Sequence, residues 1–133
     1  MTELFAFPDI EAELVGWLTA LLAEMDDSAV VGTKVPNPLP QRLVRLVRAG
    51  GAQRNLVTDA PRVVFECWDG DEVAAAQLAR TVRALLWAAA PGRIGAIWCN
   101  KIVDAGLVPS PDPDTGTPRY LITAELHVSG VPL

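Results

Sequence analysis

The chain has 133 residues, half of them hydrophobic, which predicts one domain with its own core and excludes global disorder. No apolar run reaches the ~18–20 residues that span a bilayer, so we expect no membrane. The N-terminus MTELFAFPDIEAELVGWL begins acidic and lacks the basic segment of a secretory signal, so we expect the protein to be made and kept in a cytoplasm.

The net charge of −5 is unevenly distributed along the chain. Residues 1–27 carry only acids, whereas residues 28–62 carry one acid, Asp59, and six bases: Lys34, Arg42, Arg45, Arg48, Arg54 and Arg62. Opposed patches on a small domain favour head-to-tail self-association, in which different surfaces of neighbouring copies meet around a ring. A scatter of solvated surface charges is the alternative explanation. The acidic total charge argues against nucleic-acid binding.

The first predicted element is an amphipathic helix over residues 9–24. Asp9 is placed to cap its N-terminus, and Glu11 and Glu13 favour the positive end of the helix dipole. Its apolar residues recur at spacings of four, three and one, which puts them on one stripe: Ile10, Leu14, Trp17, Leu18, Leu21 and Leu22.

Strands and loops are predicted for the next forty residues. A short strand is expected in the segment 29–35, and three prolines between Pro36 and Pro40 then stiffen a loop. RLVRLVR predicts a strand over 42–48 with apolar groups on both faces, although arginine at every third residue makes a helix conceivable. Residues 50–61 predict an extended mobile loop or arm, followed by a strand at 62–68.

The second half of the chain predicts one helix and two strands. Asp71 can cap the helix, Pro91-Gly92 stops it, and its small apolar residues allow close packing on a sheet. Strands are expected at 94–103 and 119–128, the latter with one buried and one wetter face. Without a repeating βαβ rhythm, the predicted fold class is α+β: a mostly antiparallel sheet with two helices packed on one face.

No motif for catalysis, metal binding or cofactor binding is recognisable. His127 is expected on the polar face of the last strand, with no carboxylate within local reach. Asp69 and Asp71 are explained by turn formation and helix capping, and the Asp112–Asp114 segment is a turn more simply than a calcium loop. We therefore expect no cofactor, no metal and no enzymatic activity.

The cysteines and tryptophans lie in apolar runs. Cys67 and Cys99 are predicted to be small buried hydrophobes, with a disulfide between them as an alternative that lacks positive support. The tryptophans are predicted to pack in the core or in an interface: Trp17, Trp68, Trp87 and Trp98.

Taken in order, these segments resemble the tail terminator proteins of long-tailed phages, most closely those of phages that infect actinobacteria. The resemblance covers roughly residues 28–130. Its most specific pieces are the arginine–valine strand that ends in Gly50-Gly51 and the PDPDTG loop before Arg119-Tyr120. It implies that residues 1–133 form a single α+β subunit without catalytic residues. Such subunits form a hexameric ring on the finished tail tube, at the head–tail junction of the virion, and end tube polymerisation there.

The resemblance also implies the partners: other copies of the chain, the tail tube protein and the head-side connector or stopper. DNA is expected to pass through the ring without sequence-specific binding. We expect the loops 50–60 and 107–118 to face the neighbouring tube or connector subunits. The candidate interface residues, of which the first three are expected to bind acidic groups on an adjacent copy or partner, are Arg45, Arg48, Arg54, Asp112, Asp114 and Arg119.

Three alternatives stay open. A neck stopper or connector protein is a close variant of the same structural role. A small cytoplasmic enzyme or ligand-binding domain belongs to a different class, and its site would lie between the second helix and the sheet, using Asp69, Asp71 or His127. A nucleic-acid-binding subunit would use the arginine strand, and its affinity for DNA would fall steeply with salt.

Overall fold

The computed structural model describes residues 3–133, which form two helices and nine strands. In chain order the elements are β1 (Phe5–Ala6), α1 (Ile10–Glu24), β2 (Val30–Gly32), β3 (Arg42–Arg48), β4 (Thr58–Asp59), β5 (Arg62–Asp69), α2 (Glu72–Ala89), β6 (Gly92–Ile94), β7 (Ile97–Pro109), β8 (Arg119–Ser129) and β9 (Val131–Pro132).

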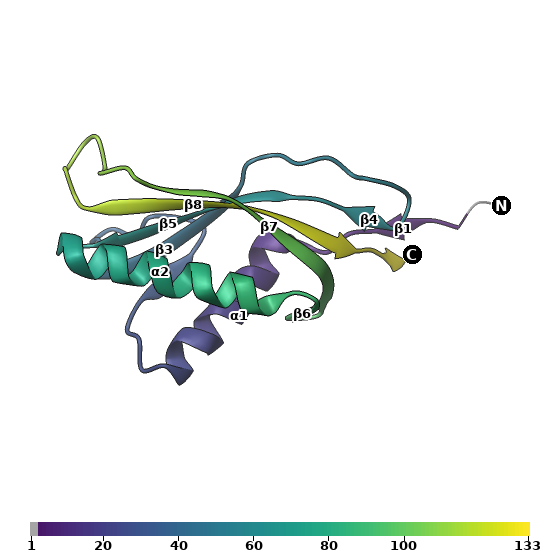
Figure 1. The fold of residues 1–133 in the computed structure, drawn as a ribbon, viewed down its shortest axis with the longest axis horizontal. Coiled ribbons are helices and arrows are strands. Elements are labelled where there is room, and N and C mark those ends of the chain that lie inside the picture. Colours follow the sequence, from purple (N-terminus) through teal and green to yellow (C-terminus); the bar gives the residue numbers. More distant parts are fainter. Residues whose placement is uncertain (1–2) are drawn as a thin grey trace.

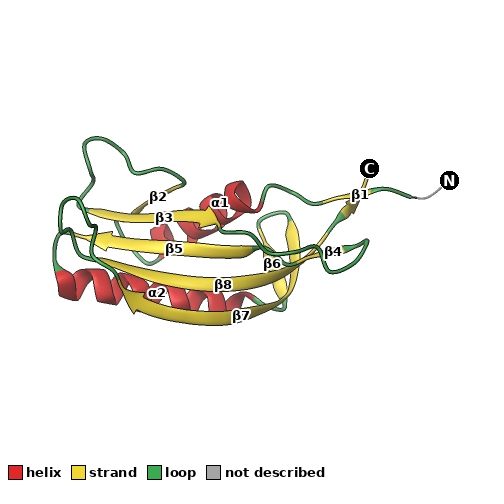
Figure 2. Cartoon of the chain, turned by 90° about the horizontal axis from the view of Figure 1, so that it is seen from above, coloured by secondary structure: helices red, strands yellow, loops and turns green. Residues whose placement is uncertain are grey.

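Most strands belong to one curled sheet with the order β2-β3-β5-β8-β7-β6, and β4 pairs with β8 beside it. Only the pair β2–β3 is parallel, while the other pairs are antiparallel. Both helices lie under the same face of this sheet, α1 on the side of β2 and β3 and α2 on the side of β7 and β8 (Figures 1 and 2). The predicted α+β fold, with two helices on one face of a mostly antiparallel sheet, is confirmed.

Both helices start at the predicted caps and bury the predicted stripes. The Asp9 carboxylate accepts hydrogen bonds from two backbone N–H groups of α1, and Asp71 accepts one from Ala74 N at 3.0 Å. The stripes meet the helix-facing sheet surface in one core, where the fully buried side chains include Leu14, Leu18, Leu22, Leu46, Val63, Phe65, Leu78, Val82, Ile122 and Leu126. This continuous apolar layer is the main stabilising contact between the helices and the sheet.

The two cysteines are buried free thiols, as predicted. Cys67 lies on β5 and Cys99 on β7, and both side chains belong to the core. Because burial disfavours the thiolate, the pKa of each thiol is raised above its ordinary value. In this environment the two cysteines are unreactive and serve as packing residues.

Two predicted segments differ from the structure. The strand predicted at 94–103 is a hairpin, because Gly95 adopts φ +59° and turns the chain between β6 and β7. Strand β7 then continues to Pro109, so the expected loop 107–118 begins only at residue 110. The expected mobile arm at 50–61 is folded back onto the sheet, where β4 pairs with Ser129 and Val128 of β8. The ends of the chain add an unpredicted ribbon, in which β1 pairs with β9.

A buried arginine ties both helices to the sheet. Arg42, the first residue of β3, donates from Nε and Nη2 to the Asp27 carboxylate, each at 2.9 Å. Its Nη1 donates to Asp69 Oδ2 at 3.1 Å and to the carbonyl of Ala74 at 3.0 Å, and Nη2 also donates to Gln77 Oε1. All five guanidinium donors are therefore used. The guanidinium also holds the pKa of Asp27 below its ordinary value.

Replacing Arg42 with alanine should lower the free energy of unfolding by about 3–5 kcal/mol, because the buried Asp69 and the largely buried Asp27 lose their cation. Urea denaturation followed by circular dichroism measures this change. Arg93→Ala is the matched control, since Arg93 is exposed and no carboxylate among residues 3–133 pairs with it. Its effect should stay within about 0.5 kcal/mol. Equal effects of the two variants would show that the Arg42 contacts contribute little.

Candidate subunit interface

Arg45 and Arg119 share one carboxylate on the sheet face that the helices leave open. Arg45 Nη1 lies 2.9 Å from Glu66 Oε2, and Arg119 Nη1 lies 4.0 Å from Glu66 Oε1. The Arg119 guanidinium also lies over the Trp68 ring, 5.1 Å from its centroid, and the Trp68 indole donates to Glu66 Oε1 at 3.2 Å. Two guanidinium groups against one carboxylate leave this cluster with a net positive charge.

Arg54 fastens the loop 50–60 to the same face of the sheet. Its Nη2 lies 2.6 Å from Glu125 Oε1, and His127 Nε2 lies 2.9 Å from the same oxygen. The expectation that no carboxylate reaches His127 is therefore wrong: residues i and i+2 of a strand point to the same side, which places Glu125 beside the imidazole. Arg54 holds the pKa of Glu125 below its ordinary value.

Arg48 closes the base of the same loop from the helix-facing side of β3. Its Nη1 lies 3.0 Å from Asp59 Oδ2 and its Nη2 3.3 Å from Oδ1, so the two planar groups meet at two points. The guanidinium also donates to the carbonyls of Gly50 and Gly51. Gly51 has φ +92°, and a Cβ there would lie 2.2 Å from the carbonyl oxygen of Ala60. The Gly50-Gly51 step is therefore a structural requirement of this loop.

The three arginines expected to bind a neighbouring copy are each paired within the chain. Arg45 and Arg48 lie on opposite faces of β3, because residues of a strand alternate, and Arg54 lies in the loop. The structure thus does not gather them into one patch. Their binding to acidic groups on another subunit stays a prediction, and it would require them to share or exchange the carboxylates that they hold.

The loop 110–118 is the turn that its sequence predicts. The Asp112 carboxylate accepts hydrogen bonds from the backbone N–H and the hydroxyl of Thr115, and Gly116 N donates to the Asp112 carbonyl. Asp114 is exposed at the tip. The loop projects at the end of the sheet opposite the two chain termini (Figure 1). Across residues 3–133 no group of three or more histidine, cysteine or acidic side chains could hold a metal ion, and no helix there is long and apolar enough to cross a membrane.

The residues named for the alternative ligand site, Asp69, Asp71 and His127, do not all lie in one place. Asp69 binds Arg42, and Asp71 caps α2 at one end of the sheet. Trp68, the residue before Asp69, pairs with Arg119 of β8. His127 lies eight residues further along β8, which corresponds to about 25 Å of strand. It also points to the opposite face. The structure therefore separates His127 from Asp69 and Asp71, whereas Asp71 N donates to Asp69 Oδ1 at 2.9 Å.

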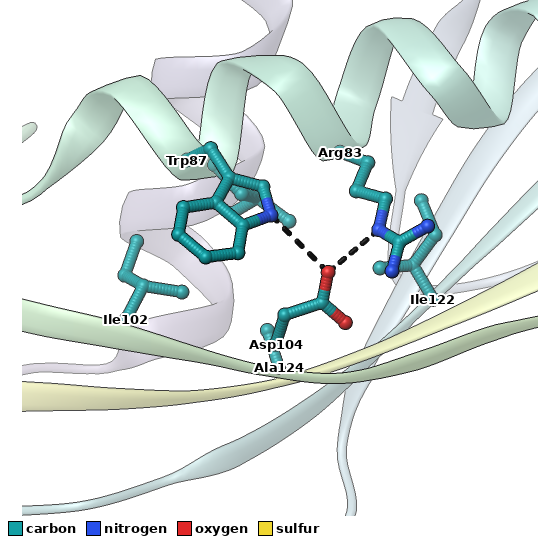
Figure 3. A pocket seen from close by; sticks show the side chains of 7 residues that line it. Arg83, Trp87, Ile102, Asp104, Ile122 and Ala124 are labelled. Atoms are coloured by element: carbon teal, nitrogen blue, oxygen red, sulfur yellow. Dashed lines mark hydrogen bonds and ion pairs between the residues drawn. The ribbon is translucent and has the colours of Figure 1, made fainter.

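An unpredicted cluster lies where α2 meets β7, around a small hollow between α2, β7 and β8 (Figure 3). Asp104 Oδ2 accepts from Arg83 Nε at 2.6 Å and from Trp87 Nε1 at 3.2 Å. Arg83 holds the pKa of this carboxyl below its ordinary value. Trp87 is nevertheless 66% exposed, so its indole is oriented by Asp104 while much of its surface faces solvent.

Large exposed apolar side chains also occur at the two edges of the sheet. At the β2 edge these are Met25 and Val30, and at the β7 edge they are Trp87, Val103 and Val108. Sequence analysis missed both groups, because strand order decides which strand lies at an edge. For the group at the β7 edge the sequence did hold a signal: Arg80, Arg83 and Trp87 are spaced by three and four residues, which places them on one face of the helix.

Removing Arg48 should destabilise the fold more than removing Arg54. Arg48→Met leaves the buried Asp59 carboxylate without its cation and should lower the free energy of unfolding by about 2 kcal/mol or more. Arg54→Met breaks a pair whose arginine side chain is 54% exposed, so a much smaller loss of stability is expected. Urea denaturation of both variants provides the comparison, and the reverse ranking would refute a structural role for the Arg48–Asp59 pair.

The comparisons with known proteins assign no family to this chain. No protein-family model matches the sequence, and the search of curated proteins finds no match. The function proposed below therefore depends on the order of the sequence segments and on the geometry of the described residues.

Proposed function

We propose that this protein is a tail terminator, a structural virion protein that forms a ring at the head–tail junction of a long-tailed phage. The ring ends polymerisation of the tail tube and offers the attachment surface for the head connector. The observation that carries the proposal is the order of segments over residues 28–130, from the arginine–valine strand to the PDPDTG loop, which resembles that family.

The shape of the chain supports this role. The loop 110–118 projects at one end of the sheet, and both termini with the ribbon β1–β9 project at the other (Figure 1). A subunit at a junction needs two different ends, one for the tube and one for the connector, in addition to the sides that meet neighbouring copies. The chain also offers two unlike sheet edges, which a head-to-tail ring requires.

The charge of the chain supports passage of DNA through the ring without sequence-specific binding. A net charge of −5 gives no general attraction to phosphates. The arginines of the strand β3 are held by Asp27, Asp69, Glu66 and Asp59, which reduces their availability to nucleic acid.

Electron microscopy of a lysate from a phage in which this gene is silenced tests the function. Overlong tail tubes beside tailless, DNA-filled heads are expected, because tube growth has lost its stop. Re-expression of the protein from a plasmid is the control and should restore tails of normal length. Tails of normal length that fail to join heads would assign the protein to the connector or stopper instead, and intact virions would remove the structural role.

A further inference from the structure

We propose that neighbouring copies of this chain meet through opposite edges of the sheet. The β7 flank of one copy, made of Arg80, Arg83, Trp87, Lys101 and Val103, contacts the β2 flank of the next. The β2 flank is made of Glu24, Met25, Asp26 and Val30. This inference rests on the proposed ring and names the surfaces that build it. The partner that binds each flank is a second copy of the same chain.

Both edges have open backbone groups. Strand β6 covers β7 only opposite Ile97–Cys99, so from Lys101 onward β7 pairs with β8 alone among the described strands. Strand β2 is the last strand at the opposite edge of the sheet, and it pairs with β3 on one side only. Unpaired N–H and C=O groups at a strand edge are a template for another strand.

The β7 edge restricts which partner fits. Register shifts between Cys99 and Lys101 and between Asp104 and Leu107 leave a regular stretch of Lys101–Asp104. Bulges of this kind, together with an edge lysine and Pro109, hinder indiscriminate pairing along the strand. The partner strand β2 spans only Val30–Gly32, so its length suits this short stretch.

The two flanks carry opposite charges. The β2 flank holds the acids Glu24 and Asp26, whereas the β7 flank holds the bases Arg80, Arg83 and Lys101, of which Arg83 is paired with Asp104. Glu24 and Asp26 are exposed at the C-terminal end of α1, where the helix dipole disfavours acids and the last turn holds no base. Arg80 and Lys101 are exposed, and within residues 3–133 neither has a carboxylate at ion-pair distance. A second copy supplies the missing counter-charge to both flanks.

Exposed apolar side chains accompany these charges. Met25 and Val30 are 54% and 44% exposed on the β2 flank, and Val103 is 43% exposed on the β7 flank. Trp87 adds the largest surface, and its bond to Asp104 fixes the indole before any contact forms (Figure 3). An oriented aromatic ring loses little conformational freedom on binding, which favours it as the centre of an interface.

The surfaces are unlike, so the contact is heterologous and each copy uses both flanks. Such a contact closes into a ring when the rotation between copies permits, and otherwise continues as a filament. A contact between two β7 edges would instead be isologous and would give a dimer that stops growing.

Cysteine cross-linking distinguishes these arrangements. Val30→Cys and Val103→Cys are made as separate variants, purified, mixed and oxidised with oxidised glutathione. A heterologous contact joins the two variants to each other in the mixture, and neither variant should link to itself. Wild-type protein should give no cross-link, because Cys67 and Cys99 are buried. Val73→Cys mixed with Val30→Cys is the matched control and should give no cross-link, since Val73 is exposed at the start of α2 and lies outside both flanks.

The contribution of charge is measured in the same assay. Arg80→Glu combined with Lys101→Glu, introduced into the Val103→Cys variant, should reduce the yield of the mixed cross-link at least tenfold, because acids then face acids. Arg62→Glu is the control, since Arg62 is exposed on β5, an inner strand of the sheet away from both edges, and no carboxylate of residues 3–133 forms an ion pair with it; its yield should be unchanged. An unchanged yield in the double variant overturns the charge argument.

The remaining outcomes separate this inference from the proposed function. Self-linking of Val103→Cys, or absence of the mixed cross-link, overturns the edge-to-edge contact. If native mass spectrometry still detects ring oligomers in that case, the terminator role stands and another surface builds the ring. If the mixed cross-link forms but gene silencing leaves virions intact, the contact stands and the terminator role falls.

Discussion

The hydrogen bonds of Arg42 determine how the ends of the two helices meet the sheet. One guanidinium group on β3 joins Asp27, which follows α1, to Asp69 at the end of β5 and to the first turns of α2. Apolar packing alone holds helices to a sheet without fixing their ends, because it is not directional. Two of the five donors hold Asp27 and so fix the end of α1 and the position of the β2 flank, while the other three reach Asp69, Ala74 and Gln77. An interface built on that flank starts from a rigid surface, which lowers the cost of association.

Internal pairing changes where the chain can attract a partner. Counted along the sequence, the basic charge is concentrated in residues 28–62, which first suggested Arg45, Arg48 and Arg54 as interface residues. In the structure each of them faces a carboxylate of the same chain, so most of that charge is compensated. Two exposed bases that no carboxylate of residues 3–133 pairs with, Arg80 and Lys101, lie later in the chain, beside the β7 edge. The acidic N-terminal region still provides the oppositely charged surface that would meet these bases.

Local signals predicted the parts of the fold that depend on neighbours in sequence. The caps Asp9 and Asp71 and the alternation of β8 are set by residues within a few positions of one another, and each is confirmed. The turn at Gly95 was missed because the apolar run on both sides of it continues without interruption. The partner of Arg54 is 71 positions away, at Glu125. The open edges were likewise hidden, because pairing order joins distant segments.

The role proposed for this protein is to stop the growth of a tail tube, and polymerisation of purified tail tube protein in its presence tests that role most directly. Tube lengths are recorded by electron microscopy at increasing concentrations of the protein. The account predicts that tubes become shorter as the concentration rises and that a ring is visible at one end only. A length distribution that does not change at saturating protein, with bare tube ends, would contradict it.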